Sequence, residues 1–86
     1  LICGSGVGVD IAANKFEGIR AGLGINSQQV ASARRDDNIN VLAIAADETV
    51  SEDAVAILAS FIETEFEPSA NHARRLKEIE EIERKT

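Results

Sequence analysis

Cysteine, histidine and aromatic residues are scarce in this 86-residue sequence, and each shortage excludes a class of protein. The single cysteine, Cys3, excludes an internal disulfide, and with the single histidine, His72, it cannot complete a Cys/His zinc site. Three phenylalanines, with no tryptophan or tyrosine, leave few candidates for stacking on the bases of a single-stranded nucleic acid. No apolar run approaches the roughly 20 residues that span a bilayer. We expect no metal, no nucleic-acid partner and no membrane partner.

Basic residues are also few. Nine Lys and Arg face fifteen Asp and Glu, and the formal net charge of −6 disfavours binding to phosphate backbones. Hydrophobic residues make up 44% of the sequence, which suits a globular core. A chain of this length buries only about two-thirds of its unfolded surface, so a lone monomer is marginally stable. We expect one domain over residues 1–86, and no signal peptide is recognisable, which favours a cytoplasmic location.

The hydrophobic pattern predicts seven elements in the order strand, helix, strand, helix, strand, helix, helix. They are predicted at residues 1–3, 9–16, 19–23, 27–37 and 40–45, followed by a helix after Thr49 and a helix from about His72. This order favours an α/β fold, a Rossmann-like three-layer sandwich with a parallel sheet. Because Leu1 already reads as part of a strand, we expect the N-terminal strands of the domain to be missing from the sequence.

Particular residues predict where the helices begin and end. Gly18 is predicted to cap the first helix at its C-terminus, and Ser27 to cap the second at its N-terminus. Thr49 and Glu52 have the spacing of a capping box for the third helix. The predicted buried faces of the last two helices are Ala54, Val55, Leu58, Phe61 and Ile62, and then Leu76, Ile79 and Ile82. We expect Asn14 to bond loop backbone and Arg34–Arg35 to form a solvated helix face.

Ligands of parallel α/β sheets bind at the carboxyl ends of the strands. This rule points to residues 3–8, 24–27 and 45–48. The loop Gly4–Gly8 lies between a predicted strand and a predicted helix, where backbone N–H groups form a site for a phosphate or an oxyanion. Cys3 precedes this loop directly, and a helix N-terminus makes a nearby thiol a better base or nucleophile. The alternatives are a plain tight turn, an inert buried cysteine, and a module that binds a nucleotide or another small molecule.

The segment from Cys3 to Arg20 resembles the signature segment of type B ribose-5-phosphate isomerases and their galactose-6-phosphate isomerase relatives. Ile11–Lys15 and Gly18–Arg20 carry the most specific part of this resemblance. Further similar stretches are residues 38–43, 66–67 and 72–75. The resemblance covers essentially the whole sequence but corresponds to the C-terminal part of the family's domain. The family's first strands and an Asp–His pair near their start have no counterpart here.

The resemblance implies an aldose–ketose isomerase that acts on a sugar phosphate through a cis-enediolate, without metal or cofactor. Cys3 corresponds to the catalytic base of one subgroup, whereas another subgroup has a Glu at the position of Val9. Ser5 corresponds to a hydroxyl residue that contacts sugar oxygens, and the amides of Gly4, Gly6, Val7 and Gly8 to groups that stabilise the enediolate. His72 and Arg75 are the implied phosphate contacts. The resemblance also implies that they reach across the interface of a homodimer or higher homo-oligomer.

Several positions depart from the family's pattern. Asp36–Asp37 replace a His–Asn pair used in ring opening, and Asp47 and Asn71 replace arginines that contact phosphate. A carboxylate repels a phosphate where a guanidinium would bind it. The sequence therefore leaves three readings open within the family. They are an active sugar-phosphate isomerase, an isomerase of a different sugar, and a catalytically silent or heteromeric subunit.

Overall fold

The computed structural model describes residues 1–85 and contains three strands and four helices within them. In chain order these are β1 (Ile2–Cys3), α1 (Val7–Ala13), β2 (Ala21–Gly24), α2 (Ser27–Asp37), β3 (Val41–Ala45), α3 (Ser51–Glu63) and α4 (Ala70–Lys85). The predicted order of elements is confirmed. Each of the first three helices is followed or preceded by a strand, as expected of an α/β chain.

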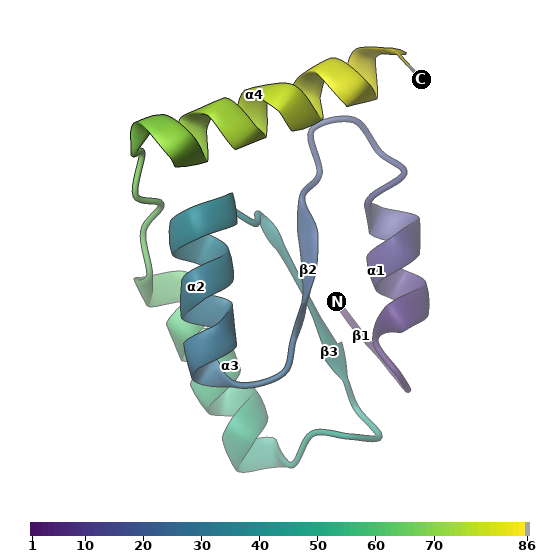
Figure 1. The fold of residues 1–86 in the computed structure, drawn as a ribbon. Helices are drawn as coiled ribbons and strands as arrows, with labels where there is room; N and C mark the ends of the chain where they lie inside the picture. Colours follow the sequence, from purple (N-terminus) through teal and green to yellow (C-terminus); the bar gives the residue numbers. More distant parts are fainter. Residues whose placement is uncertain (86) are drawn as a thin grey trace.

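The three strands form one parallel sheet in the order β1–β3–β2. Figure 1 shows α1 on one face of this sheet and α2 with α3 on the other, so the predicted three-layer sandwich is confirmed. The strands all run in one direction, and their carboxyl ends therefore share one edge. In Figure 1, α4 lies across the opposite edge, where β2 begins.

The core lies between the sheet and the pair α2–α3. Val30, Leu42, Ile44 and Ile57 form its buried cluster, with Phe61 packed against it. A Cβ atom at Gly24 would lie 2.9 Å from both Ile57 and Leu42 side-chain atoms. The absence of a side chain at this strand position therefore lets α3 pack closely on the sheet.

The predicted buried face of α3 is wrong in part. Ile57 is the residue of α3 with no exposed surface, whereas Val55, Leu58 and Ile62 are 68%, 48% and 70% exposed. Apolar residues occupy most of the circumference of this helix, so periodicity alone does not fix its rotation. The space above Gly24 accommodates the Ile57 side chain, and this packing determines which face is buried.

Two predicted N-caps are displaced by one residue. Asn26, not Ser27, caps α2, because its side-chain oxygen accepts a 2.8 Å hydrogen bond from the Gln29 N–H. The N-cap of α3 is Val50, which makes no side-chain cap, so Thr49 does not form the predicted capping box. Asn and Ser both cap helices well, and the sequence therefore did not distinguish the neighbouring candidates at α2.

The first helix also differs from its prediction. It begins at Val7 rather than Val9 and ends at Ala13 rather than Phe16. Gly18 has a φ of 80°, but it lies in the turn that follows and does not cap α1. Its left-handed backbone lets the chain reverse into β2.

Arg34 is not the solvated side chain that the sequence predicts. Its Nε donates a 3.1 Å hydrogen bond to the Thr64 carbonyl, and its Nη1 donates to the Ile39 carbonyl. Its guanidinium carbon lies 5.0 Å from the centre of the Phe61 ring. Arg34 therefore joins α2 to α3 and to the start of β3, while the Arg35 side chain is 45% exposed, as predicted for a solvated position.

Candidate active site

The glycine loop occupies the carboxyl end of β1 and leads into α1. Gly6 is the N-cap of α1 and has a φ of 74°, a left-handed conformation that favours glycine. A Cβ atom there would lie 2.5 Å from Leu23 Cδ1 and 3.0 Å from the Ala45 nitrogen. The loop therefore packs tightly on the ends of β2 and β3, and a side chain at this position would separate them.

Four backbone N–H groups of this loop have no hydrogen-bond acceptor among residues 1–85. They belong to Gly4, Ser5, Gly6 and Gly8, whereas the Val7 N–H donates a long 3.3 Å hydrogen bond to Ser5 Oγ. Successive unpaired amides at a strand-to-helix turn are suited to hold an anion or a developing oxyanion. Apart from the Val7 N–H, the N–H groups of the loop thus donate no hydrogen bond to an acceptor within residues 1–85.

The thiol of Cys3 lies at the start of this loop and is partly exposed. Cys3 pairs in register with Ala45, and paired residues of parallel strands point to the same face of the sheet. By the same register Ile2 shares a face with Ile44, which belongs to the buried cluster, so Cys3 points to the other face, toward α1. The sulfur therefore lies outside the main hydrophobic core.

The loop after β3 is tied to the glycine loop. The Ala46 N–H donates a 2.8 Å hydrogen bond to the Cys3 carbonyl, and the Asp47 N–H donates a 3.0 Å hydrogen bond to the Gly4 carbonyl. A Cβ atom at Gly4 would lie 2.7 Å from Asp47 Oδ2. These contacts bring the Asp47 carboxylate against the backbone of the candidate site.

A small cavity of about 200 Å³ lies where the loops at the carboxyl edge meet. Leu23 and Ile25 form its apolar wall, and Ser5, Glu48 and Thr49 contribute polar groups. The rule that ligands bind at the carboxyl ends of parallel strands had pointed to these loops. The rule identified the right region of the sheet. Sequence spacing could not predict that Thr49 lines the cavity or that Asp47 contacts Gly4.

His72 and Arg75 lie on α4, far from the glycine loop. His72 Nδ1 is 2.7 Å from the Glu67 carbonyl oxygen, and His72 Nε2 is 3.5 Å from Asp36 Oδ1. Arg75 is exposed on the same helix. Figure 1 places α4 at the edge of the sheet opposite the end of β1, where Cys3 lies. Within one chain the structure therefore separates the predicted site residues into two groups.

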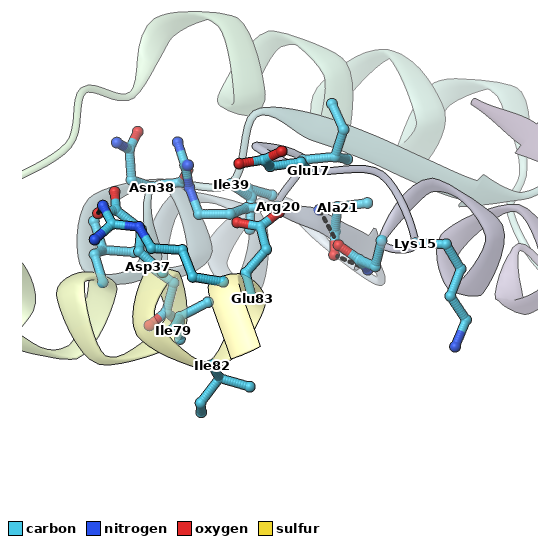
Figure 2. A pocket seen from close by; sticks show the side chains of 15 residues that line it. Lys15, Glu17, Arg20, Ala21, Asp37, Asn38, Ile39, Ile79, Ile82 and Glu83 are labelled. Carbon is cyan, nitrogen blue, oxygen red and sulfur yellow. Dashed lines mark hydrogen bonds and ion pairs between the residues drawn. The ribbon is translucent and has the colours of Figure 1, made fainter. Parts of the chain in front are cut away.

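A larger groove of about 1170 Å³ separates α4 from the turn before β2. Its walls carry charges of both signs, including Arg20, Asp37 and Glu83 (Figure 2). The Gly18 N–H donates a 2.6 Å hydrogen bond to Glu83 Oε1 and so fixes the end of α4. Neither Cys3 nor any residue of the glycine loop lines this groove, although residues of the stretches Ile11–Lys15 and Gly18–Arg20 do.

Potential metal ligands are scattered rather than grouped. In the part of the chain that the structure describes, no three or more His, Cys, Asp or Glu side chains come together as a metal ion would require. Over residues 1–85 no helix has both the length and the apolar character needed to cross a bilayer.

The sequence and the fold both have close counterparts among known proteins. The family model described as Ribose/Galactose Isomerase matches residues 1–79. A probable ribose-5-phosphate isomerase B from Mycoplasma pneumoniae is 42% identical over 84 residues, which cover 98% of this chain and 55% of that protein. Ribose-5-phosphate isomerase B from Escherichia coli is 36% identical over 85 residues, covering 99% of this chain and 56% of the relative.

Solved structures of type B ribose 5-phosphate isomerases are also similar to this chain. The type B ribose 5-phosphate isomerase from Trypanosoma cruzi superposes with a TM-score of 0.97 at 36% identity, over 99% of this chain and 56% of that one. The Mycoplasma genitalium ribose-5-phosphate isomerase B with bound ribulose-5-phosphate gives a TM-score of 0.95 at 38% identity, over 100% and 56% of the two chains.

The chain thus spans just over half the length of the relatives that it matches. The matched family model extends over nearly all of it, through the glycine loop and every strand to the middle of α4. This extent of similarity, with the parallel sheet already described, shows that the chain belongs to the Ribose/Galactose Isomerase family.

Proposed function

We propose that this chain forms part of an aldose–ketose isomerase whose substrate is a sugar phosphate of the ribose 5-phosphate and ribulose 5-phosphate type. The observation that carries the proposal is the partly exposed Cys3 thiol at the head of a loop with unpaired amides. The relatives support it, since they are named ribose-5-phosphate isomerase B and one of their structures contains ribulose-5-phosphate.

The proposed reaction uses Cys3 as the base. Its thiolate removes the proton from the carbon next to the carbonyl, and the electron pair of the broken C–H bond moves to the carbonyl oxygen. The resulting cis-enediolate receives hydrogen bonds from the free amides of the glycine loop, which stabilise its charge. The thiol then returns the proton to the neighbouring carbon, while the hydroxyl proton on the first carbon's oxygen passes to the former carbonyl oxygen, so that a new C=O bond forms at the first carbon and Cys3 is a thiolate again. Ser5, at the wall of the small cavity, binds a sugar hydroxyl.

The phosphate requires cations that the carboxyl edge does not have. We propose that His72 and Arg75 supply them from a second copy of the chain, because both lie on α4 at the opposite edge of their own sheet. The site would then be complete only in a homodimer or a higher homo-oligomer. In this proposal residues 1–86 act as one domain, and a reducing cytoplasm keeps Cys3 free of disulfide formation.

The alternative is a silent or heteromeric subunit, or an isomerase of a different sugar. The carboxylate of Asp47 against Gly4 favours this alternative, because it stands next to the loop that would bind the anion. Asp36 Oδ1 lies 3.5 Å from His72 Nε2, so a phosphate approaching His72 also meets a carboxylate that repels it.

The test is solvent deuterium exchange with a panel of aldoses and aldose phosphates in D₂O. Active enzyme introduces deuterium at C2 of its substrate, and Cys3→Ala lowers that rate by about 10²- to 10⁴-fold, as loss of a general base does. Circular dichroism of Cys3→Ala should show an unchanged fold, since the thiol is not part of the buried core. Ser32→Ala, a polar-to-alanine change on α2, provides the matched control.

The outcomes distinguish an active isomerase, a silent subunit and a nucleotide-binding module. Deuterium in any sugar supports catalysis, and unchanged exchange by Cys3→Ala eliminates Cys3 as the base. No exchange across the panel, with the protein folded, supports a silent subunit. A rise in melting temperature with nucleotides but not with sugars favours a nucleotide-binding module.

A further inference from the structure

The carboxyl edge of the sheet has acidic side chains and lacks basic ones. Glu48 lines the small cavity, and Asp47 lies against Gly4. No Lys or Arg occurs between Arg35 and Arg74, so neither the loop after β3 nor α3 contributes a cation. An anion approaching Cys3 from this side therefore meets carboxylates, and the available donors are uncharged: backbone N–H groups and the hydroxyls of Ser5 and Thr49.

Asp47 has the closest link to the glycine loop. Its N–H donates a 3.0 Å hydrogen bond to the Gly4 carbonyl, which fixes the backbone, and its Oδ2 lies 2.7 Å from the position that a Cβ atom of residue 4 would take. The carboxylate has no hydrogen-bond donor or ion-pair partner among the contacts of residues 1–85. It is exposed and remains available to a ligand.

We propose that Asp47 is a specificity-determining residue of the proposed sugar site. A carboxylate accepts hydrogen bonds from sugar hydroxyls but has no donor for the oxygens of a phosphate, which it repels. Asp47 therefore holds the hydroxyl-bearing, uncharged end of the sugar against Gly4 and excludes a phosphate from that side. The favoured substrates are sugars that are uncharged at the end nearest Asp47. This inference rests on the proposed function, because it concerns the same site.

The consequence is measurable as a ratio of affinities. Removing the charge with Asp47→Asn strengthens binding of a phosphorylated sugar relative to its neutral counterpart. For charges about 5 Å apart in a water-like medium, the expected change in that ratio is roughly 3- to 10-fold. Because the carboxylate is exposed, salt screens the effect, and the change should shrink at an ionic strength of about 0.5 M.

The experiment compares D-ribose with D-ribose 5-phosphate. Their dissociation constants are obtained from shifts of the Gly4 and Gly6 amide resonances in ¹H–¹⁵N spectra of the full chain. Asp47→Asn is measured beside Asp53→Asn, which removes one negative charge from an exposed position in the first turn of α3. Asp53→Asn should change the ratio by less than about twofold, because Asp53 makes no contact with Gly4.

The outcomes distinguish this inference from the proposed function. A salt-sensitive rise in the ratio of affinities in Asp47→Asn alone supports the role of Asp47. An unchanged ratio, or an equal change in both variants, overturns that role even where ribose 5-phosphate binds and is isomerised. If neither sugar shifts the loop resonances of the wild-type chain or of Asp47→Asn, the proposed sugar site is refuted. The role of Asp47 in specificity is then refuted as well.

Discussion

Asn14 and Ala21 exchange two hydrogen bonds across the turn that joins α1 to β2. Asn14 Nδ2 donates to the Ala21 carbonyl at 3.0 Å, and the Ala21 N–H donates to Asn14 Oδ1 at 2.8 Å. Asn14 Nδ2 also lies 3.0 Å from the Asp10 carbonyl oxygen. Asn14 is therefore structural, but its side-chain amide bonds the backbone of α1 and of the first residue of β2 rather than the loop backbone that the sequence predicts.

Replacing this amide should destabilise the fold. We expect Asn14→Ala to lower the free energy of unfolding by about 1–2 kcal/mol, because both bonds to Ala21 are lost. Urea unfolding followed by circular dichroism measures this difference. The exposed neighbour Lys15→Ala serves as control and should change stability by about 0.5 kcal/mol or less. Equal effects of the two substitutions would contradict the role assigned to Asn14.

Two glycines of the candidate site should respond in opposite directions to alanine. Gly6→Ala forces a side chain into a left-handed backbone and against Leu23 and Ala45, so we expect a loss of about 2 kcal/mol or more. Gly8 lies within α1, and a Cβ atom added there would have no neighbouring atom within 4 Å, so Gly8→Ala should stabilise by about 0.5–1 kcal/mol. Thermal unfolding of the two variants tests both signs, and a stable Gly6→Ala would refute the loop geometry.

The rotation of α3 can be tested by truncating one buried and one exposed residue. Ile57→Ala removes a side chain with no exposed surface and should cost about 2–5 kcal/mol. Val55→Ala, two residues away and 68% exposed, should change stability by about 0.5 kcal/mol or less. Chemical denaturation at a common temperature provides the comparison. A larger loss for Val55 than for Ile57 would restore the face that the sequence predicted.

The cap of α2 offers a similar comparison between adjacent residues. Asn26→Ala removes the side-chain oxygen that accepts from the Gln29 N–H, and its expected cost is about 1 kcal/mol. Ser27→Ala should cost distinctly less, because the Ser27 hydroxyl does not cap the helix. The midpoints of urea unfolding decide between them, and a reversed order would place the cap at Ser27.

Local patterns predicted the elements well and their faces less well. The apolar stretch 41–45 and the glycine loop have signatures that depend on neighbours in sequence, and both were predicted in type, although α1 begins at Val7 and so includes the last two residues of the predicted loop. The buried face of α3 depends on the space above Gly24, which lies in another element. The Arg34 contacts with Thr64 and Phe61 likewise join residues about 30 positions apart, so no local pattern indicates them.

The part of the candidate site that comes from one strand and the loop after it was predictable from the sequence. Cys3 ends β1, and Ser5 and the glycines of the loop follow it directly, so these residues lie near one another because they are neighbours in the sequence. Their contact with Asp47 depends on β1 and β3 being neighbours, although β2 lies between them in the chain. The place of His72 beside Asp36 depends on how α4 crosses the sheet, which the helical pattern of α4 does not define.

Helix α4 has no fully buried residue along its 16 positions. Helix α4 can detach by breaking few contacts. We therefore expect its local unfolding to need less free energy than unfolding of the whole molecule. Detachment would break the hydrogen bond from the Gly18 N–H to Glu83 while the cluster around Ile57 stays packed. In amide hydrogen exchange, α4 should therefore lose its protons through partial opening, whereas β3 should lose them only when the whole molecule unfolds.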